Sequence, residues 1–116
     1  MRTIKIFDIE ITLDDFREHK WALANNFKTK QGWELPTEEY FPIFEMLANM
    51  GVGNFKPDQF YWGKEQKILK KNTFDSSSRE SFLAHAYRYD NIRNDIRSEF
   101  MNPHNSFRIK LIRKIK

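Results

Sequence analysis

Residues 32–36 (Gly-Trp-Glu-Leu-Pro) limit the possible folds of this chain more than any other stretch. A proline pushes the residue before it out of the helical region, so residues 33–36 are predicted to be extended. The run that follows it, up to Met50, is the most apolar in the sequence. Thr37 suits the N-cap of a helix there, and the side chains predicted to face the core are Tyr40, Ile43, Phe44 and Leu47.

A proline and several glycines limit this helix at both ends. Pro42 removes one backbone donor, so either the first turn is loose or the regular helix begins near Phe41. Gly51 is predicted to end the helix. The glycines and the proline of residues 51–59 then predict a loop.

The N-terminal part is predicted to hold a strand and a helix. In residues 3–11 isoleucines alternate with charged residues, as in a strand, and a phase shift at residues 7–8 predicts a bulge or a twist. Thr12, with Asp15 three residues later, has the spacing of a capping box. We therefore predict a first helix from Thr12 to about Phe27.

Three later segments are predicted to be strands. Residues 60–62 are a short aromatic run (Phe-Tyr-Trp). Residues 81–89 have apolar side chains on both faces, which is expected of a strand buried on both sides. Residues 107–111 alternate between apolar and basic residues and predict a last strand. The polar segments 64–80 and 90–106 are predicted to be loops.

The order of these elements predicts a fold class. Helices early and strands late indicate one α+β domain over residues 1–116, with a twisted antiparallel sheet. In that sheet the N- and C-terminal strands are expected to pair. Asp8 and Glu10 would then lie near Arg108 and Lys110.

The composition excludes several kinds of protein. The chain has no cysteine, which excludes disulfides, thiolate nucleophiles and Cys-ligated zinc. The N-terminus lacks the apolar core of a signal peptide, and no run approaches the ~18 apolar residues of a membrane span. We therefore expect a cytoplasmic protein that does not enter a membrane.

The net charge of +4 is unevenly distributed. Residues 1–60 hold 7 basic and 10 acidic residues, whereas residues 61–116 hold 13 and 6. A basic half can bind nucleic acid or an acidic partner, but it can also pair with the acidic half or be solvated. The candidate binding residues are Lys64, Lys67, Lys70, Lys71 and Arg79 in segment 64–80, and Arg93 and Arg97 in segment 90–106.

Four stretches together resemble a known family. They are residues 32–37 (Gly-Trp-Glu-Leu-Pro-Thr), residues 61–65 (Tyr-Trp-Gly-Lys-Glu), the alternating residues 83–89, and residues 108–113 (Arg-Ile-Lys-Leu-Ile-Arg). Their order and spacing resemble bacterial domains with a C-type-lectin-like fold, related to the formylglycine-generating-enzyme fold. Glu34 stands where those domains have a basic residue, and Gly63 and Lys64 stand where they have serines.

This resemblance implies a C-type-lectin-like fold and a binding role. Members of this type mostly bind proteins, glycans or other ligands. The enzyme branch uses cysteines, which this chain lacks. The calcium loop of lectins is matched only by residues 56–58 (Lys-Pro-Asp), with a lysine where calcium needs an oxygen ligand, so a turn is the preferred interpretation.

The usual catalytic and metal-binding patterns are not found in the sequence. His19, His85 and His104 lack the spacing of metal ligands. Glu38 and Glu39 are adjacent on a helix, so they do not face each other, and they are better explained as first-turn charges. There is no nucleophile elbow and no phosphate-binding loop. We therefore expect no catalytic residue, no metal and no cofactor.

Three functional hypotheses remain open at this stage. The first is a non-enzymatic binding module that recognises another protein through segments 64–80 and 90–106, since loops on a rigid scaffold often carry binding. The second is a nucleic-acid-associated protein that uses the basic C-terminal half. The third is a small inhibitor from a mobile element that blocks a host complex. The sequence leaves the partner and the oligomeric state open.

Overall fold

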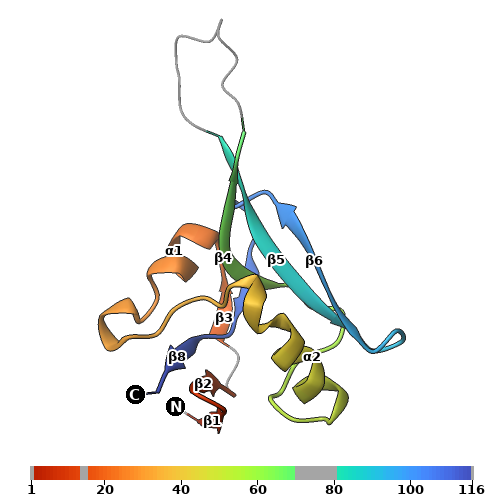
Figure 1. Cartoon of the computed structure of the whole chain (residues 1–116). Coiled ribbons are helices and arrows are strands. Elements are labelled where there is room, and N and C mark those ends of the chain that lie inside the picture. The colour runs from red at the N-terminus through yellow and green to blue at the C-terminus, as the bar shows by residue number, and fades with distance from the viewer. Residues whose placement is uncertain (1, 14–15, 70–80, 116) are drawn as a thin grey trace, which may run out of the picture.

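The structure is a computed structural model that describes residues 2–13, 16–69 and 81–115. Figure 1 shows the elements, with both ends of the chain in the lower part of the molecule. In chain order these are β1 (Thr3–Ile6), β2 (Ile9–Thr12), β3 (Phe16–His19), α1 (Trp21–Asn26), η1 (Thr29–Gln31), η2 (Glu38–Tyr40), α2 (Phe41–Asn49), β4 (Tyr61–Ile68), β5 (Phe82–Asp90), β6 (Asp95–Met101), β7 (Phe107–Ile109) and β8 (Ile112–Lys114). No helix in the described ranges is long and apolar enough to cross a membrane.

The strands form a small sheet and a larger one. The small sheet has the order β1-β2-β8, and the larger sheet has the order β3-β7-β4-β5-β6. Neighbouring strands are antiparallel except for β4 and β7, which are parallel. Strand β6 is therefore at one edge of the larger sheet, and β3 is at the other.

The predicted pairing of the N- and C-terminal strands is confirmed, although with another register. Strand β2 pairs with β8, and Glu10 lies opposite Arg113. The expected neighbours of Glu10 are elsewhere: Arg108 is in register with Tyr61. Lys110 is fully buried, with its Nζ 3.4 Å from the carbonyl oxygen of Thr12.

The first predicted strand is in fact a hairpin. Residues 3–6 and 9–12 form β1 and β2, which pair with Ile6 opposite Ile9. The phase shift at Phe7 and Asp8 is thus a two-residue turn and not a bulge or a twist. Phe7 has a φ of 53°, a conformation that bulky residues rarely adopt.

The prediction of a first helix from Thr12 to Phe27 is wrong for most of its length. Residues 16–19 form β3, which pairs with β7, and only Trp21–Asn26 is helical. Pairing with a distant strand overrides the local helical pattern here. The hydroxyl of Thr12 accepts a hydrogen bond from the Leu111 amide instead of capping a helix, and Asp15 is outside the described residues.

Residues 33–36 are extended, as predicted, and Glu34 pairs with the C-terminal strand. Gly32 before them has a φ of 83° and lies in the left-handed region. The amide and carbonyl of Glu34 both bond to Ile112, at 2.9 Å. The guanidinium of Arg113 lies 4.4 Å from the centre of the Trp33 ring. The regular helix α2 begins at Phe41, which is the second of the two predicted alternatives.

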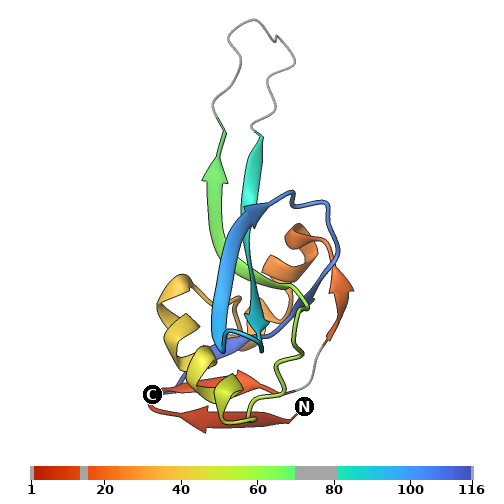
Figure 2. The same ribbon diagram turned by 90° about the vertical axis from the view of Figure 1, so that its right-hand side faces the viewer.

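The larger sheet is covered on both faces. Strand β5 alternates as predicted: Tyr87 and Tyr89 pack against α2, whereas Ala84 and Ala86 pack against α1. Figure 2 shows α2 beside β6, with the small sheet and both termini at the base. Trp33 and Trp62 belong to the same buried cluster.

The two segments predicted to be loops are largely strands where they are described. Strand β4 continues to Ile68, so Lys64 and Lys67 are on a strand and not in a loop. Segment 90–106 contains a turn and then β6. Both strands form because they pair with the two sides of β5, which no local pattern in these polar segments indicates.

Candidate functional site

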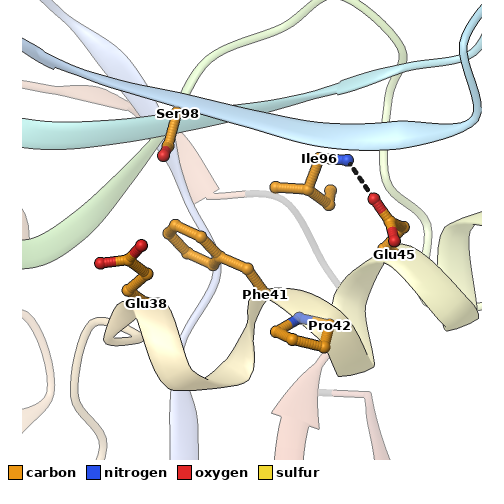
Figure 3. Close-up of a pocket in the computed structure, with 6 residues that line it drawn as sticks. All are labelled: Glu38, Phe41, Pro42, Glu45, Ile96 and Ser98. Carbon is orange, nitrogen blue, oxygen red and sulfur yellow. Dashed lines mark hydrogen bonds between the residues drawn. The ribbon is translucent and has the colours of Figure 1, made fainter.

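A groove runs between α2 and the edge strand β6. It encloses about 270 Å³, and Figure 3 shows its lining residues, which are Glu38, Phe41, Pro42, Glu45, Ile96 and Ser98. Ser98 reaches from the strand toward the ring of Phe41, and the two glutamates are on either side of that ring (Figure 3). We call these six residues the α2–β6 groove.

The register of the sheet explains which side chains of β6 face the groove. Ile96, Ser98 and Phe100 are opposite Tyr89, Tyr87 and His85 of β5. Residues paired across an antiparallel ladder point to the same face. Since Tyr87 and Tyr89 pack under α2, alternate side chains of β6 point toward α2 as well.

Two carboxylates, those of Glu38 and Glu45, line this groove, and a third, that of Glu65, bonds to the backbone beside it. Glu45 Oε1 accepts a hydrogen bond of 2.8 Å from the Ile96 amide. Both carboxylate oxygens of Glu65 accept from the Glu38 amide, at 3.1 and 3.0 Å. The Glu38 carboxylate makes no hydrogen bond or ion pair with any residue in the described ranges. None of the three is paired with a lysine or an arginine of the described chain.

His85 extends this acidic region into the core. Its side chain is buried, and its ring stacks on Phe100 with a centroid distance of 4.7 Å. Its Nδ1 lies 3.6 Å from Glu65 Oε1 and has no hydrogen-bond partner among the residues described.

The outer edge of β6 presents backbone groups. Ile96 of β6 lies opposite Tyr89 of β5. The Ile96 amide donates to Glu45 and the Tyr89 carbonyl accepts from the Asp58 amide, so these two residues do not exchange hydrogen bonds with each other. In an antiparallel ladder such residues alternate with those that bond across. Ser98 and Phe100 therefore direct their amide and carbonyl groups outward, where no other described residue bonds to them.

The basic residues predicted from segment 64–80 are on β4 or outside the described residues. Lys64 makes an ion pair of 2.8 Å with Glu34, whereas Lys67 is exposed on the same strand. Lys70, Lys71 and Arg79 are outside the described residues. Only part of this predicted group can therefore be placed.

The arginines predicted from segment 90–106 are paired with acids. Arg97 Nε lies 3.4 Å from Asp90 and 3.3 Å from Asp95, and Arg93 lies 4.0 Å from Asp90. Hydrogen bonds from the backbone amides of Arg93 and Ile92, with the nearby guanidinium of Arg97, hold the pKa of the Asp90 carboxyl below its ordinary value. The positive charge at this turn is thus largely compensated.

The structure does not bring the two predicted basic groups together. Lys67 is opposite Leu83 on one side of β5, whereas Arg97 is opposite Arg88 on the other side. Leu83 and Arg88 are five positions apart in β5, which corresponds to about 17 Å along the strand. The described ranges contain no group of three or more His, Asp or Glu side chains that could hold a metal ion.

Sequence reasoning missed the α2–β6 groove. Glu38 and Glu45 are seven residues apart, which places them on one side of a helix. This signal is weak by itself, because the groove also needs β6, and β6 lies in a segment that was predicted to be a loop.

Comparisons with known proteins identify the fold. No protein-family model matches the chain, and no curated protein matches it in sequence. Among solved structures, rhodocetin is similar with a TM-score of 0.67 and 11% identity, covering 98% of this chain and 95% of that one. EMS16, described as an antagonist of the collagen receptor integrin α2β1, is similar with a TM-score of 0.65 and 12% identity, covering 97% and 96%.

Rhodocetin and EMS16 are snake-venom C-type-lectin-like proteins. At this level of identity the likeness concerns the fold and not the function. It extends over nearly the whole of each chain. The protein therefore has an α+β fold of the C-type-lectin-like class, as its sequence predicted.

Proposed function

We propose that this chain is a non-enzymatic binding module that recognises another protein. The observation that carries the proposal is the position of β6, an edge strand whose alternate side chains line a groove that is both apolar and acidic. Grooves with few, well-placed polar groups on a rigid scaffold are typical of recognition sites. EMS16, which has the same fold, is described as an antagonist of an integrin, and this supports a role in protein recognition.

The proposed contact surface comprises segments 64–80 and 90–106. The proposed contact residues within the described ranges are Lys64, Lys67, Arg93 and Arg97. The proposal also includes three residues outside those ranges, Lys70, Lys71 and Arg79. Lys64 and Lys67 are on β4 and Arg97 is on β6, on the two sides of β5, so a partner would have to reach across β4, β5 and β6. We also propose that the chain acts in the cytoplasm and is related to the bacterial C-type-lectin-like domains that its motifs resemble.

Affinity capture followed by mass spectrometry tests this function. The tagged chain is incubated with a native lysate, beside two variants, Lys64→Ala with Lys67→Ala and Arg93→Ala with Arg97→Ala. The control variant is Arg17→Ala with Lys30→Ala, at exposed positions in β3 and η1. We expect one protein to be retained by the wild type and the control, and to be reduced in at least one test variant. Equal recovery by all of them would refute the proposed surface.

A nucleic-acid-associated function is the second candidate. The observation that favours it is the excess of 13 basic over 6 acidic residues in residues 61–116. Phosphate contacts make such binding fall steeply with salt. A gel-shift series with double- and single-stranded DNA and RNA from low to moderate salt decides the question, because absence of binding at low salt excludes this function.

A further inference from the structure

We propose that the α2–β6 groove takes an extended, basic segment of another protein, which pairs with β6 as an added strand. This inference rests on the proposed function and names the kind of partner and the place where it binds. Strand addition to an open sheet edge is a common mode of peptide recognition, in which the backbone supplies affinity and alternate side chains supply specificity. Three features of β6 and its surroundings lead to this proposal.

The first feature is the unpaired backbone of β6. The outward amides and carbonyls of Ser98 and Phe100 have no partner among the described residues. The amide of Ile96, at the start of the same edge, is already bonded to Glu45. An added strand would therefore pair along Ser98 and Phe100 and end near Ile96, where the side chain of Glu45 occupies the edge.

The second feature is charge. Glu38 and Glu45 line the groove, and Glu65 bonds to the Glu38 amide beside it. None of the three is paired with a lysine or an arginine of the described chain, although the chain as a whole is basic. In contrast, Asp90 and Asp95 at the neighbouring turn are paired with Arg97. The unbalanced acids favour a lysine or an arginine of the partner at this place and disfavour an acidic segment.

The third feature is the apolar floor. The ring of Phe41, the partly buried Ile96 and the half-exposed ring of Phe100 lie on the same side of β6. A strand added beside β6 places every second side chain over this floor. The expected segment thus alternates, with apolar and basic side chains toward α2 and any residues toward the other face.

Selection from a random octapeptide library displayed on phage tests the inference without a natural partner. Selected peptides are synthesised, and their dissociation constants are measured for the wild type and for variants. Ser98→Pro removes one outward amide at an edge position that tolerates proline, whereas Ser98→Ala keeps the amide. Glu38→Lys reverses one groove charge, and Glu18→Lys, on the opposite edge strand β3, is its control.

We expect peptides with at least one lysine or arginine among alternating apolar residues. Their affinity should fall about tenfold or more with Ser98→Pro and with Glu38→Lys, and change less than about twofold with the two controls. Circular dichroism and thermal unfolding show whether Ser98→Pro is folded; if it is not, Glu38→Lys and the amide shifts of Ser98 and Phe100 on peptide addition give the result.

Other outcomes would overturn the inference. These are a library without binders, binders without basic residues, and binders that are indifferent to both test variants. Failure of this inference is separable from failure of the proposed function. A protein captured from lysate equally well by wild type and Ser98→Pro would leave the binding module in place and exclude strand addition at β6.

Discussion

Glu10 joins the two ends of the chain, and its ionisation should be visible in stability. Its carboxylate accepts hydrogen bonds from the Thr3 hydroxyl at 2.6 Å and from Arg113 Nη2 at 2.6 Å. These two hydrogen bonds, with the charge of Arg113, hold the pKa of Glu10 below its ordinary value of 4.5. The contact thus stabilises the folded state only while Glu10 is ionised.

We predict that Glu10→Gln lowers the free energy of unfolding at pH 7 by about 1–2 kcal/mol. Because the folded pKa is lowered, the contribution is fully present above pH 4.5 and is lost as the pH falls below 4.5 through the folded pKa. Urea unfolding from pH 7 to pH 3 measures this. The two proteins should converge at low pH, and a constant difference would contradict the assignment. Glu18→Gln, at an exposed position, is the control.

At Gly63 of β4, the backbones of β5 and of the extended stretch both lie close by. A Cβ there would lie 3.3 Å from the His85 carbonyl oxygen and 3.4 Å from that of Pro36. The carbonyl of Gly63 also accepts a hydrogen bond of 3.0 Å from Trp21 Nε1. These close contacts explain why position 63 is a glycine and not a serine, as in the domains that the sequence resembles.

Gly63→Ala should therefore destabilise the fold. Both crowded atoms belong to the backbone and cannot move without shifting a strand or the extended stretch, so we expect a loss of about 1–2 kcal/mol. Chemical denaturation measures this loss. An unchanged or higher midpoint would show that Pro36 and β5 are not held as tightly as the structure indicates.

At the scale of elements, the hairpin β1–β2 has an unfavourable turn residue. Phe7 is 75% exposed and has a φ of 53°. Asparagine tolerates this left-handed conformation better than phenylalanine or alanine does. Phe7→Asn should raise the free energy of unfolding by about 0.5–1 kcal/mol, whereas Phe7→Ala should give little gain. Equal effects of both variants in thermal unfolding would assign the gain to the lost side chain and not to the backbone.

The sequence predicted those elements whose patterns are local. The extended stretch 33–36, the helix from Phe41 and the alternation of β5 were all recognisable, because proline and apolar periodicity act within a few residues. Thr37, predicted to cap this helix, makes no capping hydrogen bond, and its hydroxyl bonds to Glu39 instead. Strand β3 was mistaken for a helix, since only its pairing with β7 makes it a strand. Strand β6 was missed for the same reason, as it is polar and depends on β5.

The predictions for the site have the same limit. The basic residues were chosen by charge, but the partners of Lys64 and Arg97 come from distant or turn positions that the sequence does not bring together. The α2–β6 groove has contributions from η2, α2 and β6, so it appears only when β6 is placed. The charge pattern thus predicted segment 90–106 as a binding segment, but it did not indicate which atoms of that segment are accessible to a partner.

At the scale of the whole molecule, the fold depends on its C-terminal strand. Ile112 is fully buried and bonds to the extended stretch at Glu34, while β8 pairs with β2. A chain that ends at Leu111 should therefore lose cooperative unfolding, because β2 and the extended stretch lose their common partner. Calorimetry measures this, and removal of Lys116 alone is the control. A cooperative transition in the shorter chain would contradict this role of β8.

The central claim is that the outer edge of β6 is open and is the place of recognition. Residue-resolved amide hydrogen exchange tests it most directly, in the free chain and with a captured protein or a selected peptide. We expect Arg97 and Glu99 to be protected in the free chain, and Ser98 and Phe100 to exchange rapidly and to become protected on binding. Slow exchange of Ser98 and Phe100 in the free chain, or no change on binding, would contradict the claim.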